Sequence, residues 1–182
     1  MIEKKLLTLA GAAGILLCGA CFLPPPPEHA PLPPVLAAVH VIAIHVEDRT
    51  AGNLFDPLVM SNATASNFNR LWKEFPVRAV AFNAGGPSDA ALSITVLRKT
   101  ASCVPADKGH QFCTFELISS FTLTGADGRI LRSKPEERSK LGIRLKGDSL
   151  PQTWNSNPFL EDAGYALATT AGDKLLVLVP AN

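Results

Sequence analysis

The chain has 182 residues, of which 47% are hydrophobic and 18% are charged. This length and composition fit one globular domain with a hydrophobic core, and they exclude extensive disorder and a multidomain architecture. Lysine and arginine number 17 against 16 acidic residues. A chain so nearly balanced has no general attraction for nucleic acid, and we expect no nucleic-acid partner.

The first 20 residues have the pattern of an export signal. Lys4 and Lys5 precede an uncharged run of 12 residues, Leu6 to Leu17, and small residues follow. The run is too short to cross a bilayer, since a spanning helix needs about 20 residues. We therefore predict that residues 1–20 are a signal peptide and that the mature chain is exported.

The end of this signal reads LCGAC at residues 17–21, which resembles the signal of bacterial lipoproteins. In that family the cysteine after the small residues is acylated and becomes the first residue, so the resemblance implies lipidation, including palmitate, at Cys21. Phe22 stands where an aspartate would retain such a protein in the inner membrane, which implies an outer-membrane lipoprotein facing the periplasm. Cys18 departs from the pattern, and ordinary signal-peptidase cleavage without acylation is the alternative.

Cysteine usage agrees with an oxidising compartment. Cys18 leaves with the signal and Cys21 is acylated, which leaves Cys103 and Cys113 as a pair between two predicted strands. We predict a disulfide across the mouth of a hairpin. The alternative is a metal site that includes His110, but three ligands in one loop are too few for a closed zinc site, and we expect neither a metal nor another cofactor.

A proline-rich stretch follows the predicted acylation site. Residues 24–34 read PPPPEHAPLPP and hold seven of the 15 prolines. Such a sequence favours an extended polyproline-type conformation of ~3.1 Å per residue. We interpret residues 21–37 as a tether and residues 38–182 as the folded domain.

The domain sequence alternates between strand and helix patterns. Asp56-Pro57 and Asn157-Pro158 each combine an N-cap residue with a proline suited to the first helical turn. The expected elements are a strand at 39–46 buried on both faces, a helix from Asp56-Pro57 to before Pro76, a short strand at 77–82, alternating strands at 90–100 and 112–124, a turn at Asp127-Gly128 into a strand at 130–131, and a helix from Asn157-Pro158.

This order predicts an α+β fold: a single two-layer sandwich with a mainly antiparallel sheet and two helices on one face. A cysteine-anchored N-terminus, the polar segment at residues 47–50, the strand pattern at 88–94, the turn at 126–128 and a closing helix together resemble small envelope lipoproteins. The pattern is similar to that of outer-membrane lipopolysaccharide-assembly lipoproteins. Similar layouts occur in lipoproteins that activate peptidoglycan synthases.

One segment of the domain is strongly basic. Residues 129–146 carry a local charge of +5, because two glutamates stand among seven basic residues, which are Arg129, Arg132, Lys134, Arg138, Lys140, Arg144 and Lys146. Side chains of this kind can bind the phosphates of an anionic glycolipid. The alternative is a solvated loop with protective charges on an edge strand.

No complete catalytic motif is present in the sequence. There is no nucleophile elbow, P-loop or dinucleotide fingerprint, and a strand places His40 and His45 on opposite faces, so we expect no enzyme. A hydrolase would need a pocket that unites His45 with an acid and a nucleophile. Trp154 either fills the core or marks a partner surface.

The sequence therefore predicts a non-enzymatic outer-membrane lipoprotein that faces the periplasm and assists lipopolysaccharide assembly. The expected partners are an outer-membrane protein, such as a β-barrel, and an anionic glycolipid. The alternative function is regulation of a cell-wall synthase, or another protein-binding role in the envelope.

Overall fold

The computed structural model describes residue 32 and residues 34–52, 55–84, 86–146, 154 and 156–177. The predicted signal peptide, Cys21 and the proline-rich sequence up to residue 31 lie outside these residues. The described elements are η1 (Pro34–Leu36), β1 (Val41–Asp48), α1 (Pro57–Leu71), β2 (Arg78–Ala81), η2 (Phe82–Ala84), β3 (Ala90–Pro105), η3 (Asp107–Gly109), β4 (His110–Gly125), β5 (Ile130–Lys146), α3 (Asn157–Thr170) and the π-helical turn η4 (Ala171–Leu176).

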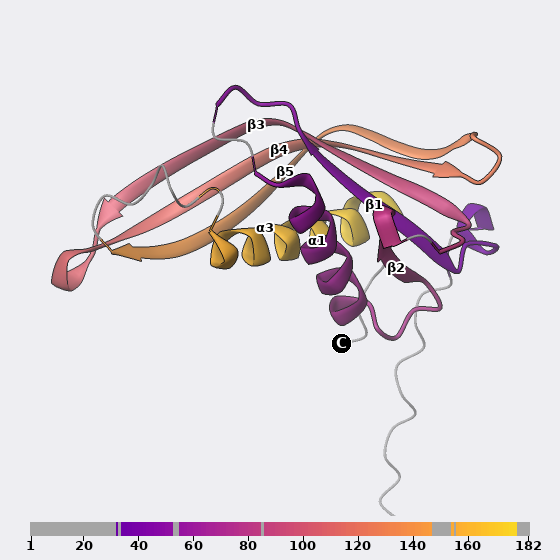
Figure 1. The fold of residues 1–182 in the computed structure, drawn as a ribbon, viewed down its shortest axis with the longest axis horizontal. Coiled ribbons are helices and arrows are strands. Elements are labelled where there is room, and N and C mark those ends of the chain that lie inside the picture. Colours follow the sequence, from indigo (N-terminus) through magenta and orange to yellow (C-terminus); the bar gives the residue numbers. More distant parts are fainter. Residues whose placement is uncertain are drawn as a thin grey trace, which may run out of the picture.

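The five strands form one mixed sheet in the order β2-β1-β3-β4-β5 (Figure 1). β1 runs parallel to both β2 and β3, whereas β3, β4 and β5 form an antiparallel meander. The predicted α+β class is confirmed, but the expectation of a mainly antiparallel sheet is wrong on the β1 side. The reason is that α1 crosses over between β1 and β2, which brings the chain back in its original direction.

The meander is longer than the sequence predicted. β5 has 17 residues, although only residues 130–131 were expected to be a strand and the rest a strand-to-loop segment. Its second half alternates, with Leu141, Ile143 and Leu145 turned toward the core and Lys140 and Arg144 exposed. The first half of β5 hides this alternation in the sequence, because Arg132, Lys134 and Glu137 occupy positions opposite helix-facing residues of β4.

The helix α1 starts as the sequence predicted, whereas α3 starts one residue earlier, with Ser156 and not Asn157 as its N-cap. The Asp56 carboxylate accepts hydrogen bonds from the backbone N–H groups of Leu58 and Val59, and Pro57 occupies the first turn of α1. α1 ends before Pro76, as predicted, at Leu71. None of the helices among the described residues is long and apolar enough to span a membrane.

The core lies between the helices and one face of the sheet. α1 and α3 contact each other, and both lie on the same side of the strands (Figure 1). Their close approach uses small residues: a Cβ built on Gly164 of α3 would come within 2.8 Å of the backbone and side chain of Ala63 of α1. The largest fully buried side chains are Phe55, Phe68, Phe115, Phe121, Phe159, Leu36, Ile42, Ile44, Met60, Leu92, Ile94 and Leu117.

The folded domain begins before the predicted boundary at residue 38. Leu36, which the sequence interpretation assigned to the tether, is 1% exposed and belongs to the core. It lies in η1, and the backbone N–H of Val39 donates to its carbonyl oxygen. An apolar side chain next to prolines is indistinguishable from a spacer residue until the core that receives it is known.

The prediction that both faces of the first strand are buried is confirmed only in part: the face toward the helices is fully buried, whereas on the other face Ala43 is buried at 6% exposure and its neighbours are not. Ile42, Ile44 and Val46 face the helices and are almost fully buried, whereas His45 on the other face is exposed. The connection after β2 crosses this other face, where the Phe82 ring of η2 lies 5.5 Å from the His45 ring. This connection between Ala81 and Ala90 leads from β2, on one side of β1, to β3 on its other side, and both strands run parallel to β1.

Candidate functional site

The face of the sheet opposite the helices is a surface built by the meander strands. Along β4 the residues turned toward the helices are buried, and those turned away from them are partly or fully exposed. We call the face of β3, β4 and β5 that is turned away from the helices the open face. The hydroxyl side chains of Ser93, Thr122 and Ser133 lie on this face, in register with one another across the three strands.

The open face holds four of the seven predicted ligand-binding residues. Arg138, Lys140 and Arg144 pair with Ile118, Glu116 and Phe112 of β4, Lys146 at the end of β5 pairs with His110, and all four basic residues are exposed. Their positions at alternate places along β5 bring the side chains to the same side of the strand.

The other predicted basic residues do not join them. Arg132 lies at a position turned toward the helices, where its guanidinium donates a hydrogen bond to the Leu175 carbonyl oxygen. Arg129 lies in the turn before β5 and faces Asp127 at 3.9 Å. Lys134 pairs with Phe121 of β4 beside a bulge of the β4–β5 pairing. The seven residues therefore do not form one patch.

Acidic side chains accompany the cations of the open face. Glu116 of β4 lies 3.1 Å from the Arg138 guanidinium and 3.6 Å from the Lys140 ammonium group. Asp107 of η3 lies 2.5 Å from the Arg144 guanidinium, and Arg98 of β3 pairs with Glu136. Sequence reasoning missed Glu116 and Asp107 because they come from β4 and η3 and not from the basic segment itself.

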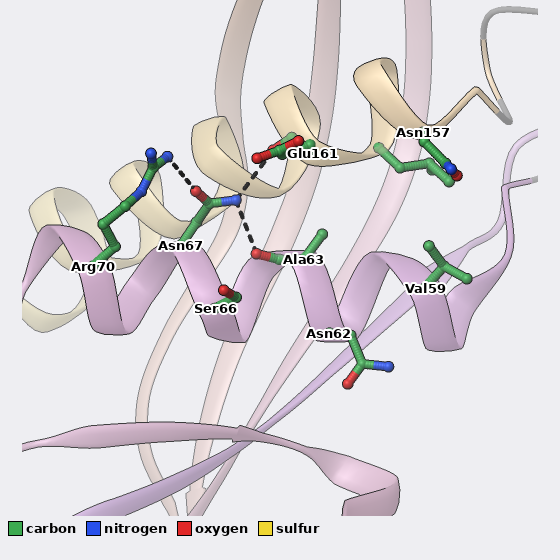
Figure 2. A pocket seen from close by; sticks show the side chains of 9 residues that line it. Val59, Asn62, Ala63, Ser66, Asn67, Arg70, Asn157 and Glu161 are labelled. Carbon is green, nitrogen blue, oxygen red and sulfur yellow. Dashed lines mark hydrogen bonds between the residues drawn. The ribbon is translucent and has the colours of Figure 1, made fainter.

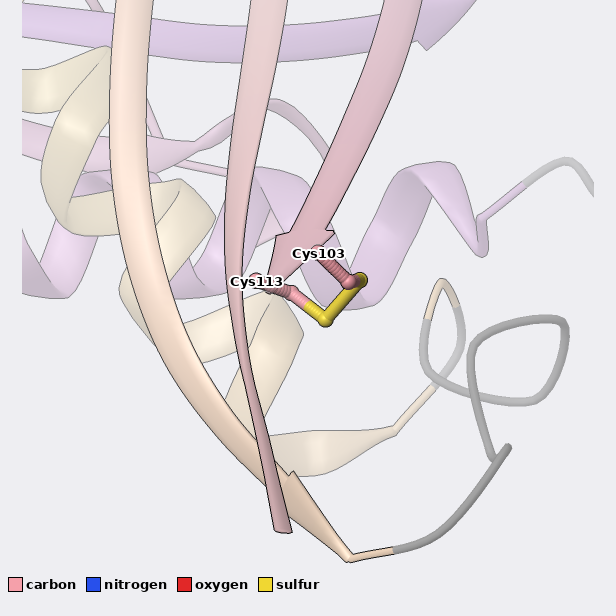
Figure 3. The surroundings of a disulfide bond; sticks show 2 residues. All are labelled: Cys103 and Cys113. Atoms are coloured by element: carbon pink, nitrogen blue, oxygen red, sulfur yellow. A yellow bond between two sulfur atoms is a disulfide. The ribbon is translucent and has the colours of Figure 1, made fainter. Parts of the chain in front are cut away.

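The predicted disulfide is present (Figure 3). Cys103 of β3 and Cys113 of β4 are direct partners across the hairpin, and their Cα atoms are 4.0 Å apart. This separation is slightly below the usual 4.4–6.8 Å range of disulfides and below the roughly 4.5 Å of directly opposed residues in an antiparallel pair. Cys113 is fully buried, so the bond ties the hairpin to the core.

The loop beyond this bond holds the alternative metal ligand. The Nδ1 atom of His110 lies 3.2 Å from the Asp107 carbonyl oxygen. Across the described part of the chain, no three His, Cys, Asp or Glu side chains are grouped closely enough to hold a metal ion.

A buried ion pair lies where β1 ends against β3. The Lys99 ammonium group is 2.7 Å from the Asp48 carboxylate. It also lies 5.4 Å from the Phe55 ring centroid and 5.1 Å from that of Trp154. Asp48 in addition accepts hydrogen bonds from the backbone and hydroxyl groups of Thr50. No sequence motif indicated this cluster, since its residues are spread over more than a hundred positions.

Trp154, which contacts this cluster, is buried in the core. This side chain is 7% exposed, and its ring lies 5.0 Å from the rings of both Phe115 and Phe159. It therefore fills the core and is not a partner surface. Packing of this kind joins the segment before α3 to the centre of the sheet.

A small pocket is lined by a histidine, an acid and a serine, the residue types that a hydrolase active site would use. His45, Asp56 and Ser61 all line a cavity of about 260 Å³ beside η2. The Ser61 hydroxyl donates to the Pro57 carbonyl oxygen and accepts from the Val46 N–H. The Asp56 carboxylate caps α1. The serine and the acid thus serve the backbone, and neither is hydrogen-bonded to the imidazole as a nucleophile–base pair requires.

A larger groove of about 450 Å³ lies between α1 and α3 (Figure 2). The Asn67 amide nitrogen donates to the carbonyl oxygens of Ala63 and Glu161, and its oxygen accepts from the Arg70 guanidinium. Arg70 also lies 5.6 Å from the Tyr165 ring centroid. These contacts bind the two helices to each other, so the polar groups of the groove are largely engaged in helix packing.

Comparisons with known proteins add a distant likeness of fold. The sequence matches no known protein family, and no curated protein matches it. A minor lipoprotein from Acinetobacter baumannii is similar in structure, with 8% identity, coverage of 75% of this chain and 93% of that chain, and a TM-score of 0.38.

Two further solved structures show a similar degree of likeness. The PelC dodecamer from Paraburkholderia phytofirmans has 13% identity, covers 79% of this chain and 94% of that chain, and has a TM-score of 0.36. Lipoprotein B from Nitrosomonas europaea has 14% identity, covers 72% and 79% of the two chains, and has a TM-score of 0.36. At these identities and TM-scores no function or residue role is carried over from them.

Proposed function

We propose that this chain is a periplasm-facing lipoprotein of the outer membrane that acts by binding and not by catalysis, and that it assists lipopolysaccharide assembly. The anchor is the acylated Cys21 of the LCGAC sequence, and Phe22 directs the protein to the outer membrane. The structural observation that carries the binding role is the open face, a long polar surface without a helical cover among the described residues.

The open face suits a phosphorylated and hydroxylated ligand. The Arg138 and Lys140 side chains are 60% and 59% exposed, and Glu116 between them holds both in place. A cation held by one carboxylate keeps donors directed at solvent, and phosphate oxygens accept such donors in charge-assisted hydrogen bonds. The neighbouring hydroxyl side chains of β3, β4 and β5 can bond the sugar hydroxyls of a glycolipid.

The same ion pairs favour a second candidate, a protein-binding envelope lipoprotein such as a regulator of a cell-wall synthase. Glu116 and Asp107 compensate much of the charge of the basic segment. A surface of alternating positive and negative groups selects a complementary protein surface by geometry more than by net charge. The two candidates share the anchor and differ in what occupies the open face.

The anchor is tested by mass spectrometry of the mature N-terminus. A diacylglyceryl mass on Cys21 is expected, and Cys21→Ser should release the protein from membranes. Cys18→Ser is the matched control and should leave the protein anchored, because that residue departs with the signal. An unmodified, soluble mature chain would overturn the lipoprotein assignment.

The ligand is tested by binding of purified lipopolysaccharide to the exported protein. Arg138→Gln with Lys140→Gln should weaken binding, and added salt should weaken binding of the unchanged protein. The control removes two exposed cations elsewhere, Lys73→Gln with Arg78→Gln, and should change little. Equal binding by the two double variants would remove the glycolipid proposal and leave the protein-binding candidate.

The partner is identified by photo-crosslinking in intact envelopes. A crosslinker in place of Thr122, on the open face, should capture the occupant, whereas one in place of the exposed Glu161 of α3 reports the opposite side. Attachment of lipopolysaccharide or a β-barrel at Thr122 supports the assembly role. Attachment of a cell-wall synthase at Thr122 supports the second candidate, and products only at Glu161 contradict both.

A further inference from the structure

The tip of the β3–β4 hairpin exposes two apolar side chains side by side. Val104 and Phe112 are direct cross-strand partners on the open face, and they are 56% and 48% exposed. Two exposed apolar groups at one place differ from the single ones that any surface carries. Phe112 also lies across Gly142 of β5, where an added Cβ would come within 2.7 Å of its ring.

Cations surround this apolar pair. Lys108 lies in η3 at the very end of the hairpin, Arg144 of β5 is opposite Phe112, and Lys146 is opposite His110. Among the described residues of the tip the acid is Asp107, which pairs with Arg144. These described residues together carry a net positive charge beside an aromatic and an aliphatic side chain that are exposed to solvent.

The tip is held rigid and stands far from the start of the domain. The Cys103–Cys113 disulfide closes the hairpin immediately behind Val104 and Phe112. In Figure 1 the β3–β4 hairpin lies at one end of the long axis, and η1 and the β4–β5 turn lie at the other. From Cys21 to η1 the chain has 13 residues, enough for ~40 Å in an extended proline-rich conformation.

We propose that this hairpin tip is a second membrane contact, which places Phe112 and Val104 at the headgroup boundary of an anionic bilayer with the basic residues at its surface. An aromatic ring beside cations is the chemistry of interfacial binding, since the ring partitions into the headgroup region and lysine and arginine neutralise lipid phosphates. This contact is separate from the ligand proposed for the open face and does not require it.

A bilayer fits the tip better than a second copy of the chain does. Two identical tips would bring like charges together around a small apolar contact, whereas an anionic surface attracts all the cations at once. An isolated tip binds weakly, and the lipid anchor raises its effective concentration at the membrane. The function of the contact is to hold the elongated domain in one orientation on the bilayer.

The test uses the mature chain with Cys21→Ser, so that no acyl chain contributes. It should co-sediment with vesicles containing about one third phosphatidylglycerol and should be released at ~1 M salt, but should not bind vesicles of phosphatidylcholine alone. Val104→Ser and Phe112→Ser should each weaken binding roughly ten-fold, and Lys108→Gln about five-fold. Ile130→Ser is the control: that residue is 62% exposed at the opposite end of the strands and should leave binding unchanged.

A fluorescence readout separates membrane contact from a structural role of Phe112. Phe112→Trp should shift its emission to the blue when the anionic vesicles are added, while Ile130→Trp should not. Absence of binding by the parent chain would overturn the proposal. So would unchanged binding by Val104→Ser together with a Phe112→Ser variant that loses only thermal stability, because Phe112 would then serve merely to cover Gly142.

Discussion

The Lys99 ammonium group and the Asp48 carboxylate form an ion pair inside the domain, with side chains that are 6% and 1% exposed. The pair joins β3 just beyond its bulge to the last residue of β1. Because the aromatic rings of Phe55 and Trp154 enclose the ammonium group, the pair also fixes the segments that precede α1 and α3. It is thus a junction of four parts of the chain.

Removal of one partner of this pair should destabilise the domain strongly. We expect Lys99→Met to lower the free energy of unfolding by about 3–5 kcal/mol, because the buried Asp48 carboxylate loses its counter-ion. The double variant Asp48→Asn, Lys99→Met should recover part of this loss. Urea unfolding of both single variants and the double variant gives the coupling energy, and purely additive losses would contradict a direct interaction.

The disulfide should contribute measurably to stability. In Cys103→Ser with Cys113→Ser the unfolded chain regains the freedom of a loop whose ends are separated by 10 residues. The chain-entropy model gives a loss of ~2.5–3 kcal/mol. Urea unfolding of the oxidised protein and the variant checks this value, and a variant as stable as the oxidised protein would show that the hairpin closes without the bond.

The contact between the helices requires glycine at position 164. A larger side chain there would meet the Ala63 backbone, so Gly164→Val should cost about 2 kcal/mol or more. Gly86 has nothing within 4 Å of an added Cβ, and Gly86→Val should change stability by less than about 0.5 kcal/mol. Thermal unfolding distinguishes the two, and similar midpoints for both variants would mean that α1 and α3 separate easily.

The carboxylate of Asp89 should make stability depend on pH. Its oxygen accepts hydrogen bonds of 2.8 and 2.9 Å from the N–H groups of His40 and Val41, which lower the pKa of this carboxyl below its ordinary value. The ionised form is therefore favoured by folding. Its contribution is present at neutral pH and is lost as the pH falls through the lowered pKa.

Asp89→Asn should accordingly unfold at a lower temperature than the parent protein at neutral pH. The gap between their midpoints should close in acid, once the parent carboxyl is protonated. Glu161→Gln is a matched control at an exposed position and should show no such narrowing. A gap that stays constant with pH would mean that Asp89 acts through its shape and not through its charge.

Local features of the sequence predicted much of the architecture. Asp56-Pro57 placed the start of α1, Asn157-Pro158 placed that of α3 to within one residue, and alternation placed the meander strands β3 and β4. The cysteine count predicted the disulfide between Cys103 and Cys113. Apart from the cysteine count, each of these signals lies within a few neighbouring residues, and the physical effects behind them are equally local.

Other features depend on contacts between segments that are distant in the sequence. The sequence placed a basic patch at residues 129–146, but β4 and η3 bring Glu116 and Asp107 to its cations, and the pleat of β5 turns Arg132 to the other face. The parallel pairing of β1 arises from the crossover through α1, and the buried Asp48–Lys99 pair from the register of β1 against β3. Charge balance, strand direction and burial are properties of the assembled sheet, because each depends on which strand becomes the neighbour.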